Sequence, residues 1–350
     1  MKRSFLVTSC SIVLGFALSI GLSNSAFAQE DRLRGAVEPV KAKKKYRIGI
    51  AVVHFVDDYW KGMAYGLVDE AKLADVEIVR IFAAGGYGKV AEQIAQLETL
   101  SALKLDAVIL GATNFEGYDR AIQRLTDKGV KVVAAGVPVN SKFVSLGVTM
   151  DEVAIGKTIA AYVCKQNANA KMITIPGPNG PAWNKLRFDG VMAGAKECPG
   201  MKLLGNTFTG DTKIEDGQSQ ASDLLIKYPD ADFIYSAAAN LGTGAALAAK
   251  SMKRPAKVVT ATVTAKTVDL MKEGNIAMVV SEPGILIGRS LIQYTVRLLN
   301  GDALPNLEDG GPIPYKQFLV PLVQLTNVNI GTYKLQSFDQ PPANWQVPSF

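Results

Sequence analysis

Apolar runs rich in β-branched residues alternate along the chain with segments in which apolar residues recur at helical spacing. This alternation is typical of βαβ units and predicts a mostly parallel sheet covered by helices. In the first half, the predicted strands cover residues 46–54, 77–83, 107–111, 131–135 and 144–148. The predicted helices between them cover residues 60–74, 89–103 and 118–128.

The same alternation starts again near residue 151. It predicts helices at 151–167, 183–197, 218–227 and 243–252, and strands at 171–175, 202–207, 233–236 and 257–261. A helix at 265–273, a strand at 277–281 and a helix at 288–299 could complete either series, and 315–324 is a late extended segment. We therefore expect an α/β protein with two doubly wound parallel-sheet lobes in tandem, joined by a hinge that the chain crosses several times.

The length supports this division, because about 320 residues beyond a leader exceed what one hydrophobic core usually holds. We expect a first lobe from residues 45–138 plus about 263–281, and a second from 139–262 plus about 282–310. The chain becomes rich in Pro and Gly after Asn300, and residues 311–350 should form a hinge strand and a surface tail. Trp345 in this tail is expected to pack back onto a lobe.

Residues 1–28 have the layout of a cleaved secretory signal: Lys2 and Arg3, an apolar run over 5–22, and a small-residue end before Gln29. Cys10 lies inside the apolar run without the surroundings of a lipoprotein signal. No later apolar run is long enough to span a bilayer. We therefore expect a soluble protein exported to the periplasm.

Charge and cysteine content exclude several classes of protein. The formal net charge is +6, or about +4 without Lys2 and Arg3, and the only basic cluster, at 41–45, precedes the first strand. No basic stripe with interleaved aromatics is present, so nucleic-acid binding is not predicted. Cys164 and Cys198 could form a disulfide in an oxidising compartment or remain two buried thiols, and their spacing fits no metal site.

Candidate ligand contacts lie in the turn between the first strand and the first helix, which reads Asp57-Asp58-Tyr59-Trp60. Helix amino termini and loop side chains meet at the carboxyl edge of a parallel sheet, where ligands bind. Capping of the helix explains one acid. It does not explain two adjacent large rings, because exposed rings are unfavourable unless something covers them. We therefore interpret Tyr59 and Trp60 as ligand contacts.

Two further turns follow the same rule. Tyr87 lies in a glycine-rich turn, 84–88, after the second strand. Residues 86–91 also match the dinucleotide fingerprint, but this turn follows the wrong strand and Asp106 opens a strand instead of closing one, so nucleotide binding is not predicted. Trp183 follows the Pro/Gly loop 176–182 after the first strand of the second series, which mirrors the Asp57–Trp60 turn. It should face the aromatic residues of the first lobe, although packing on its own lobe is the alternative.

Catalytic groups are scarce in this sequence. His54 is the sole histidine, and no nucleophile motif or metal spacing accompanies it. Asp57 and Asp58 are adjacent in sequence, and such neighbours seldom reach the geometry of an acid–base pair. We expect neither an enzyme nor a cofactor.

At these residues the chain resembles the type I periplasmic binding protein superfamily over nearly its whole length after the leader. Within that superfamily it is most similar to TorT-like proteins, which detect trimethylamine N-oxide for a respiratory system. The matching pieces are Asp58–Trp60, Ala84–Tyr87, Ile109–Thr113 and Pro176–Asn179. The resemblance implies a two-lobed receptor that closes on a small ligand.

Sugar-binding relatives place an Asn-Asp pair where this chain has Asn240-Leu241, and an aspartate where it has Thr262. These differences weaken a sugar assignment, although TorT-like proteins should have a tyrosine near Thr262. The resemblance and the turns together give one candidate ligand set: Asp58, Tyr59, Trp60, Tyr87, Asn179, Trp183, Asn240 and Thr262. We expect a methylated amine as ligand and the sensor region of a membrane histidine kinase as partner. The alternative is delivery of a sugar or related solute to an ABC permease.

Overall fold

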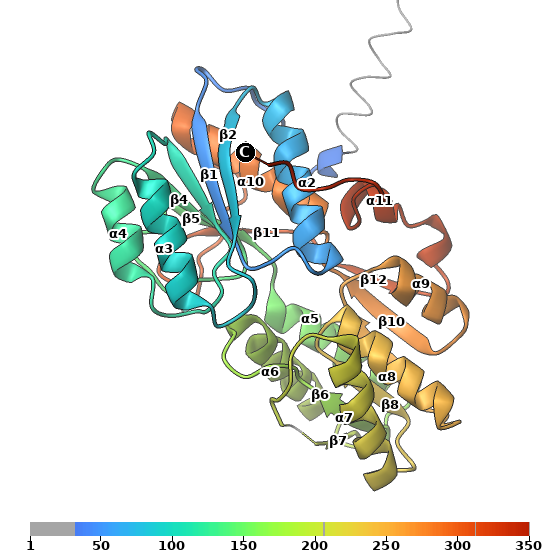
Figure 1. Ribbon diagram of the computed structural model, residues 1–350. Coiled ribbons are helices and arrows are strands. Elements are labelled where there is room, and N and C mark those ends of the chain that lie inside the picture. The colour runs from blue at the N-terminus through green and yellow to red at the C-terminus, as the bar shows by residue number, and fades with distance from the viewer. Residues whose placement is uncertain (1–31, 206, 312, 350) are drawn as a thin grey trace, which may run out of the picture.

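The computed structural model describes residues 32–205, 207–311 and 313–349, so the predicted signal segment lies outside the described residues. Each lobe is built on a six-stranded sheet (Figure 1). The first sheet has the order β11-β5-β4-β3-β1-β2, and all of its pairs are parallel. Its strands are β1 Arg47–Val52, β2 Glu77–Ala83, β3 Ala107–Leu110, β4 Lys131–Gly136, β5 Leu146–Thr149 and β11 Gln317–Leu319.

The second sheet repeats this order as β12-β10-β9-β8-β6-β7, with β12 antiparallel to β10 at the edge. Its strands are β6 Lys171–Ile175, β7 Lys202–Leu204, β8 Phe233–Ser236, β9 Lys257–Ala261, β10 Ile276–Ser281 and β12 Val323–Thr326. Strands β3, β5 and β8 are buried along their whole length, as expected for parallel strands covered on both faces. The predicted α/β class with two doubly wound lobes is confirmed.

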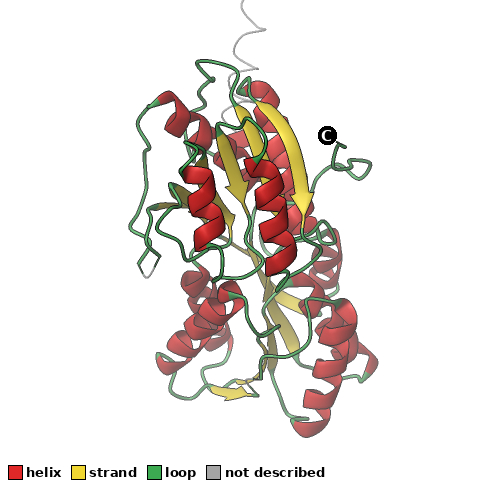
Figure 2. Cartoon of the chain, turned by 60° about the vertical axis from the view of Figure 1, so that its left-hand side comes forward, coloured by secondary structure: helices red, strands yellow, loops and turns green. Residues whose placement is uncertain are grey.

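Helices cover both sheets (Figure 2). The first lobe carries α2 Asp58–Leu73, α3 Val90–Ser101, α4 Asp119–Thr126 and α10 Gly284–Asn300. The second carries α5 Glu152–Gln166, α6 Ala182–Lys196, α7 Ile214–Lys227, α8 Ala239–Ser251 and α9 Ala265–Lys272. Late in the chain follow η1 Ile330–Thr332 and α11 Leu335–Phe338.

Glycines let two helix pairs approach closely. A Cβ added at Gly66 of α2 would lie 2.1 Å from the carbonyl oxygen of Ile285 in α10. One added at Gly156 of α5 would lie 1.9 Å from the carbonyl oxygen of Arg187 in α6. Because any larger residue would push these backbones apart, the glycines fix the α2–α10 and α5–α6 contacts.

The chain crosses between lobes three times, from β5 to α5, from β10 to α10, and from β11 to β12. The predicted allocation of two late segments is the reverse of the observed one. Residues 276–281 form β10 beside β9 in the second sheet, whereas α10 packs on α2 in the first lobe. Helical periodicity shows that a helix has a buried face but not which partner covers it, so sequence alone could not assign either segment.

The structure also answers the predictions for the two cysteines and for Trp345. Cys164 and Cys198 form a disulfide with an S–S distance of 2.03 Å, so of the two alternatives the bridge is the one observed. Trp345 packs back onto the first lobe, with its ring centroid 5.5 Å from that of Tyr65 on α2. The tail before it is more ordered than predicted, since it contains η1 and α11. Among the described residues, no helix has both the length and the apolar character needed to cross a bilayer.

Candidate functional site

A cavity of about 320 Å³ lies between the two lobes. Its wall comes from the carboxyl edges of both sheets, where α2, α5, α6, α8 and α9 begin and where the chain enters α10. This is the position at which open parallel sheets bind ligands. Helix amino termini carry backbone amides without intrahelical acceptors, so their convergence supplies hydrogen-bond donors.

Aromatic rings from both lobes line this cavity. Tyr59 of α2 and Tyr87, which follows β2, come from the first lobe, and Trp183 of α6 comes from the second. The ring centroids of Tyr87 and Trp183 are 6.0 Å apart with an interplanar angle of 43°, so the two rings meet across the gap. The predicted juxtaposition of rings from opposite lobes is therefore observed for this pair.

Trp60 does not line the cavity, contrary to the prediction. It is 1% exposed, and a Cβ added at Gly111 of the first lobe would lie 2.5 Å from its ring. Its indole Nε1 donates to the hydroxyl of Tyr87 at 3.3 Å. Trp60 thus contacts Tyr87 from outside the cavity. Adjacent side chains on α2 point about 100° apart, so Tyr59 lines the cavity while Trp60 is buried.

The other predicted contacts divide in the same way. Asp58, Asn240 and Thr262 line the cavity, whereas Asn179 is exposed and does not. The loop that carries Asn179 is held by the side chain of Asn184, whose Nδ2 donates to the carbonyl oxygens of residues 176 and 178 at 2.9 and 2.6 Å. A fixed loop backbone leaves Asn179 outside the cavity wall.

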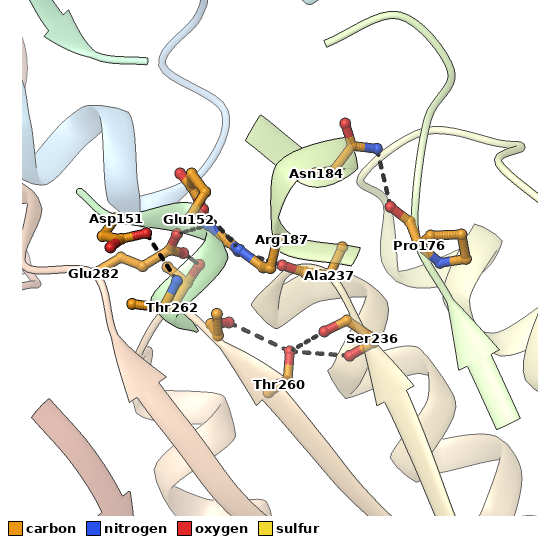
Figure 3. A network of polar contacts seen from close by, with 12 residues as sticks. Asp151, Glu152, Pro176, Asn184, Arg187, Ser236, Ala237, Thr260, Thr262 and Glu282 are labelled. Atoms are coloured by element: carbon orange, nitrogen blue, oxygen red, sulfur yellow. Dashed lines mark hydrogen bonds and ion pairs between the residues drawn. The ribbon is translucent and has the colours of Figure 1, made fainter. Parts of the chain in front are cut away.

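A buried ionic cluster forms one side of the cavity (Figure 3). Arg187 of α6 is 1% exposed and contacts the carboxylates of Glu152 and Glu282, with Nε donating to Glu152 Oε2 at 2.9 Å. The hydroxyl of Thr262 donates to the second oxygen of Glu282, and Arg187 Nη1 donates to the carbonyl of Ala237. Glu152 opens α5 and Glu282 precedes α10, so one guanidinium bridges two of the inter-lobe crossings.

The cluster shifts the pKa values of its members. Burial raises the pKa of Glu152 to about 7, although the positive charge of Arg187 acts in the opposite direction. Burial alone would lower the pKa of Arg187, but the carboxylates of Glu152 and Glu282 outweigh it and raise that pKa. Arg187 therefore stays charged, and its guanidinium carbon also lies 5.0 Å from the ring centroid of Trp183.

Two aspartates lie on the first-lobe side. Asp57 caps α2, since its carboxylate accepts from the amide of Trp60 at 3.0 Å, and His54 Nε2 lies 3.6 Å from its other oxygen. Burial raises the pKa of Asp57, while His54 lowers it. Asp58 lines the cavity and accepts from Gln340 Nε2 at 3.2 Å. The capping role predicted for one acid thus belongs to Asp57.

Two donors in the cavity wall lack acceptors. The hydroxyl of Tyr59 and the indole Nε1 of Trp183 are buried and have no hydrogen-bond partner within the described part of the chain. Burial, reinforced by the carboxylate of Glu282, raises the pKa of Tyr59 well above its usual 10, so its hydroxyl stays protonated. Unpartnered buried donors are rare in folded proteins, and both of these belong to residues that line the cavity. The Tyr59 hydroxyl lies beside Gly136, where an added Cβ would be 2.4 Å from it.

Sequence reasoning missed Glu152 and Glu282 as cavity residues. Glu282 directly follows β10, so the rule applied to the other strand ends would have found it. Glu152 resembles an ordinary acidic residue in the first turn of a helix, and its neighbours in the sequence do not indicate that it reaches the cavity. Among residues 32–205, 207–311 and 313–349, no group of three or more His, Cys, Asp or Glu side chains could hold a metal ion.

A family model described as "Periplasmic binding protein domain" matches residues 48–303. The chain belongs to the periplasmic binding protein family. The structure is similar to that of a sugar ABC transport system substrate-binding protein from Bordetella parapertussis 12822, with a TM-score of 0.87 and 37% identity over 90% of this chain and 100% of that one. The predicted membership of the type I superfamily is confirmed, and the protein is a periplasmic solute-binding protein.

Two more distant relatives also match most of the chain. The periplasmic protein TorT of Escherichia coli K12 is 23% identical over 276 residues, which cover 77% of each chain, and it bears out the TorT-like resemblance. A solute-binding protein from Actinobacillus succinogenes 130z with bound D-allose has a TM-score of 0.73 at 16% identity, covering 83% of this chain and 100% of that one. At that identity the likeness concerns the fold alone.

Proposed function

We propose that this periplasmic binding protein closes over a small methylated amine, of which trimethylamine N-oxide is the model compound. The observation that carries the proposal is the composition of the cavity wall between the lobes. Three aromatic rings, those of Tyr59, Tyr87 and Trp183, line it from both sides. A methylated ammonium nitrogen has no donor to offer and is held by ring faces, at about 0.5–2 kcal/mol per ring.

Charge favours the same class of ligand. Among the described residues, four carboxyl groups line the cavity, those of Asp57, Asp58, Glu152 and Glu282, against two cations, Arg187 and Lys266. Arg187 pairs with the two glutamates. The aspartates therefore remain on the first-lobe side beside Tyr59, where a positive nitrogen would be attracted to them.

The unpartnered donors fit the oxygen of an N-oxide. That oxygen accepts hydrogen bonds, and the Tyr59 hydroxyl and the Trp183 indole N–H have no acceptor among the described residues. A ligand that contacts Tyr59 and Trp183 together binds the closed form better than the open one, because the two residues belong to different lobes. Closure then follows from the difference in affinity between the two states.

We infer further that the closed form engages the periplasmic region of a membrane sensor histidine kinase, as the TorT-like resemblance implies. No catalytic step is proposed for this cavity, and the leader at residues 1–28 is proposed to be cleaved on export. The alternative function is delivery of a sugar to an ABC permease, supported by the 37% identity to a substrate-binding protein of a sugar ABC transport system. Arg187 and Asn240 in the cavity could donate to sugar hydroxyls.

Isothermal titration against trimethylamine N-oxide, glycine betaine, choline, ribose and allose tests the ligand class. We expect binding of at least one methylated amine. Replacing Tyr87 or Trp183 by Ala should weaken it about tenfold, which corresponds to about 1.4 kcal/mol. Tyr228→Ala, at the end of α7 and outside the cavity wall, serves as the control and should bind like wild type. Binding of sugars alone would refute the methylamine proposal.

A further inference from the structure

The chain does not end on the second lobe after β12. Ile330, Tyr333 and Leu335 pack with the core of that lobe, and the following residues run back to α2 of the first lobe (Figure 1). Phe338 lies in α11, which contacts α10 of the first lobe. The C-terminal segment thus contacts both lobes, in addition to the three covalent crossings.

Asp339 is the centre of this connection. It is 2% exposed, and its carboxylate accepts from Ser281 Oγ at 2.9 Å and from the Tyr333 hydroxyl at 2.5 Å. Ser281 ends β10 and directly precedes Glu282 at the second crossing. The carbonyl oxygen of Asp339 lies so close to Gly62 of α2 that a Cβ added there would be 2.4 Å away. One residue therefore touches the hinge end of the second sheet and the wall helix of the first lobe.

The residues around Asp339 extend this contact. Gln340 Nε2 donates to Asp58 Oδ2 at 3.2 Å, and Asp58 lines the cavity. Arg289 Nη1 of α10 donates to the carbonyl of Ser337 at 3.2 Å. Trp345 packs on Tyr65, two turns along α2 from Asp58, at an interplanar angle of 84°. The segment is thus attached to α2 at both ends of its passage along the helix.

We propose that residues 333–345 form an inter-lobe strap that sets the opening of the cleft and positions the Asp58 carboxylate at the cavity. The three crossings are covalent and bend at their backbones, whereas the strap must shift or detach whenever α2 moves away from β10. Asp339 carries the attachment to Ser281, and Gln340 carries the attachment to Asp58. The ligand-binding role of Asp58 rests on the proposed function; the control of lobe opening does not.

The distance between the lobes tests the strap without any ligand. Spin labels are attached at Arg120→Cys on α4 and Asp223→Cys on α7, both exposed, and double electron–electron resonance is measured. We expect Asp339→Ala to broaden the distribution and shift it to longer distances. Gln346→Ala, an exposed tail position, is the control and should match wild type. An unchanged distance distribution in Asp339→Ala would overturn the strap. Should that variant fail to fold, the chain lacking residues 340–350 is measured instead, and an unchanged distribution would again overturn the strap.

Hydrogen exchange at the first turn of α2 tests the positioning of Asp58, again without ligand. Gln340→Ala should raise the exchange rates of the amides of residues 59–61 several-fold, and unchanged rates would overturn this part of the proposal. With trimethylamine N-oxide as probe, Gln340→Ala should weaken binding about threefold to tenfold. Gln340→Glu should weaken it more at pH 8 than at pH 5, because only the protonated carboxyl can donate to Asp58. Absence of binding of every methylated amine by the wild type would refute the proposed function but leave the distance and exchange results to decide the strap.

Discussion

Replacement of Arg187 by Met should destabilise the protein by about 3–5 kcal/mol near pH 8, because it leaves buried carboxylates without their counter-charge. The guanidinium is 1% exposed and contacts Glu152 and Glu282, whose side chains are 4% and 7% exposed. Met is similar in length and fills most of the space, so a loss of packing contributes little. The measurement is urea unfolding followed by tryptophan fluorescence at several pH values.

The loss of stability in Arg187→Met should depend on pH. The pKa of Glu152 in the folded protein is about 7, above the ordinary value of 4.5, so its favourable contribution is present below about pH 4.5 and lost as the pH rises through 7. Without Arg187 this pKa rises further, because burial and Glu282 then act unopposed. The deficit of Arg187→Met should therefore be larger at pH 8 than at pH 5. The triple variant with Glu152→Gln and Glu282→Gln should recover most of the loss, and a deficit below about 1 kcal/mol or one independent of pH would refute the reasoning.

Three further predictions concern the frame around the site. Replacing Cys164 and Cys198 by Ser should lower the free energy of unfolding by about 3–4 kcal/mol, since the bridge closes a loop with a sequence separation of 34; thermal unfolding with and without reductant checks it. Gly66→Ala should cost about 1–3 kcal/mol, because its Cβ would meet a carbonyl of α10, whereas Gly86→Ala has open space and should be neutral in the same assay. Burial raises the pKa of Asp339 to about 7 from 3.8, so the stability of the wild type should fall as the pH rises from about 4 through 7. The urea midpoint of Asp339→Asn should depend less on pH than that of the wild type. Equal pH dependence of the two midpoints would contradict this prediction.

Much of the fold could be predicted from sequence because each βα unit carries its own periodic pattern. Strand β2 and strands β6, β8 and β9 begin and end where the apolar runs do. The assignment of β10 and α10 to lobes could not be predicted, because it depends on which neighbour covers each apolar face. Gly66 and Gly284 let α10 approach α2, but nothing in the sequence around them indicates which helix they contact.

The site could be predicted in part for a similar reason. The rule that ligands bind at carboxyl ends of strands placed Tyr59, Tyr87 and Trp183 around one cavity. It could not separate Tyr59 from Trp60, because adjacent residues at a helix start point in different directions and only the docked helix decides which one faces the gap. Nor could it find Glu152, which reaches the cavity only because α5 begins at a crossing between lobes.

The ionic cluster also explains how a contact in the cavity can be coupled to the hinge. Trp183 and Arg187 lie one turn apart on α6, and the guanidinium carbon of Arg187 is 5.0 Å from the Trp183 ring centroid. Because Arg187 is paired with acids at two of the three crossings, Trp183 lies on a helix that is fixed to two of the three hinge segments. Lobe closure would then bring Tyr59 and Tyr87 towards a ring that does not move relative to the hinge. A ligand that bridges these rings therefore acts directly on the angle between the lobes, and a ligand that contacts one lobe alone does not.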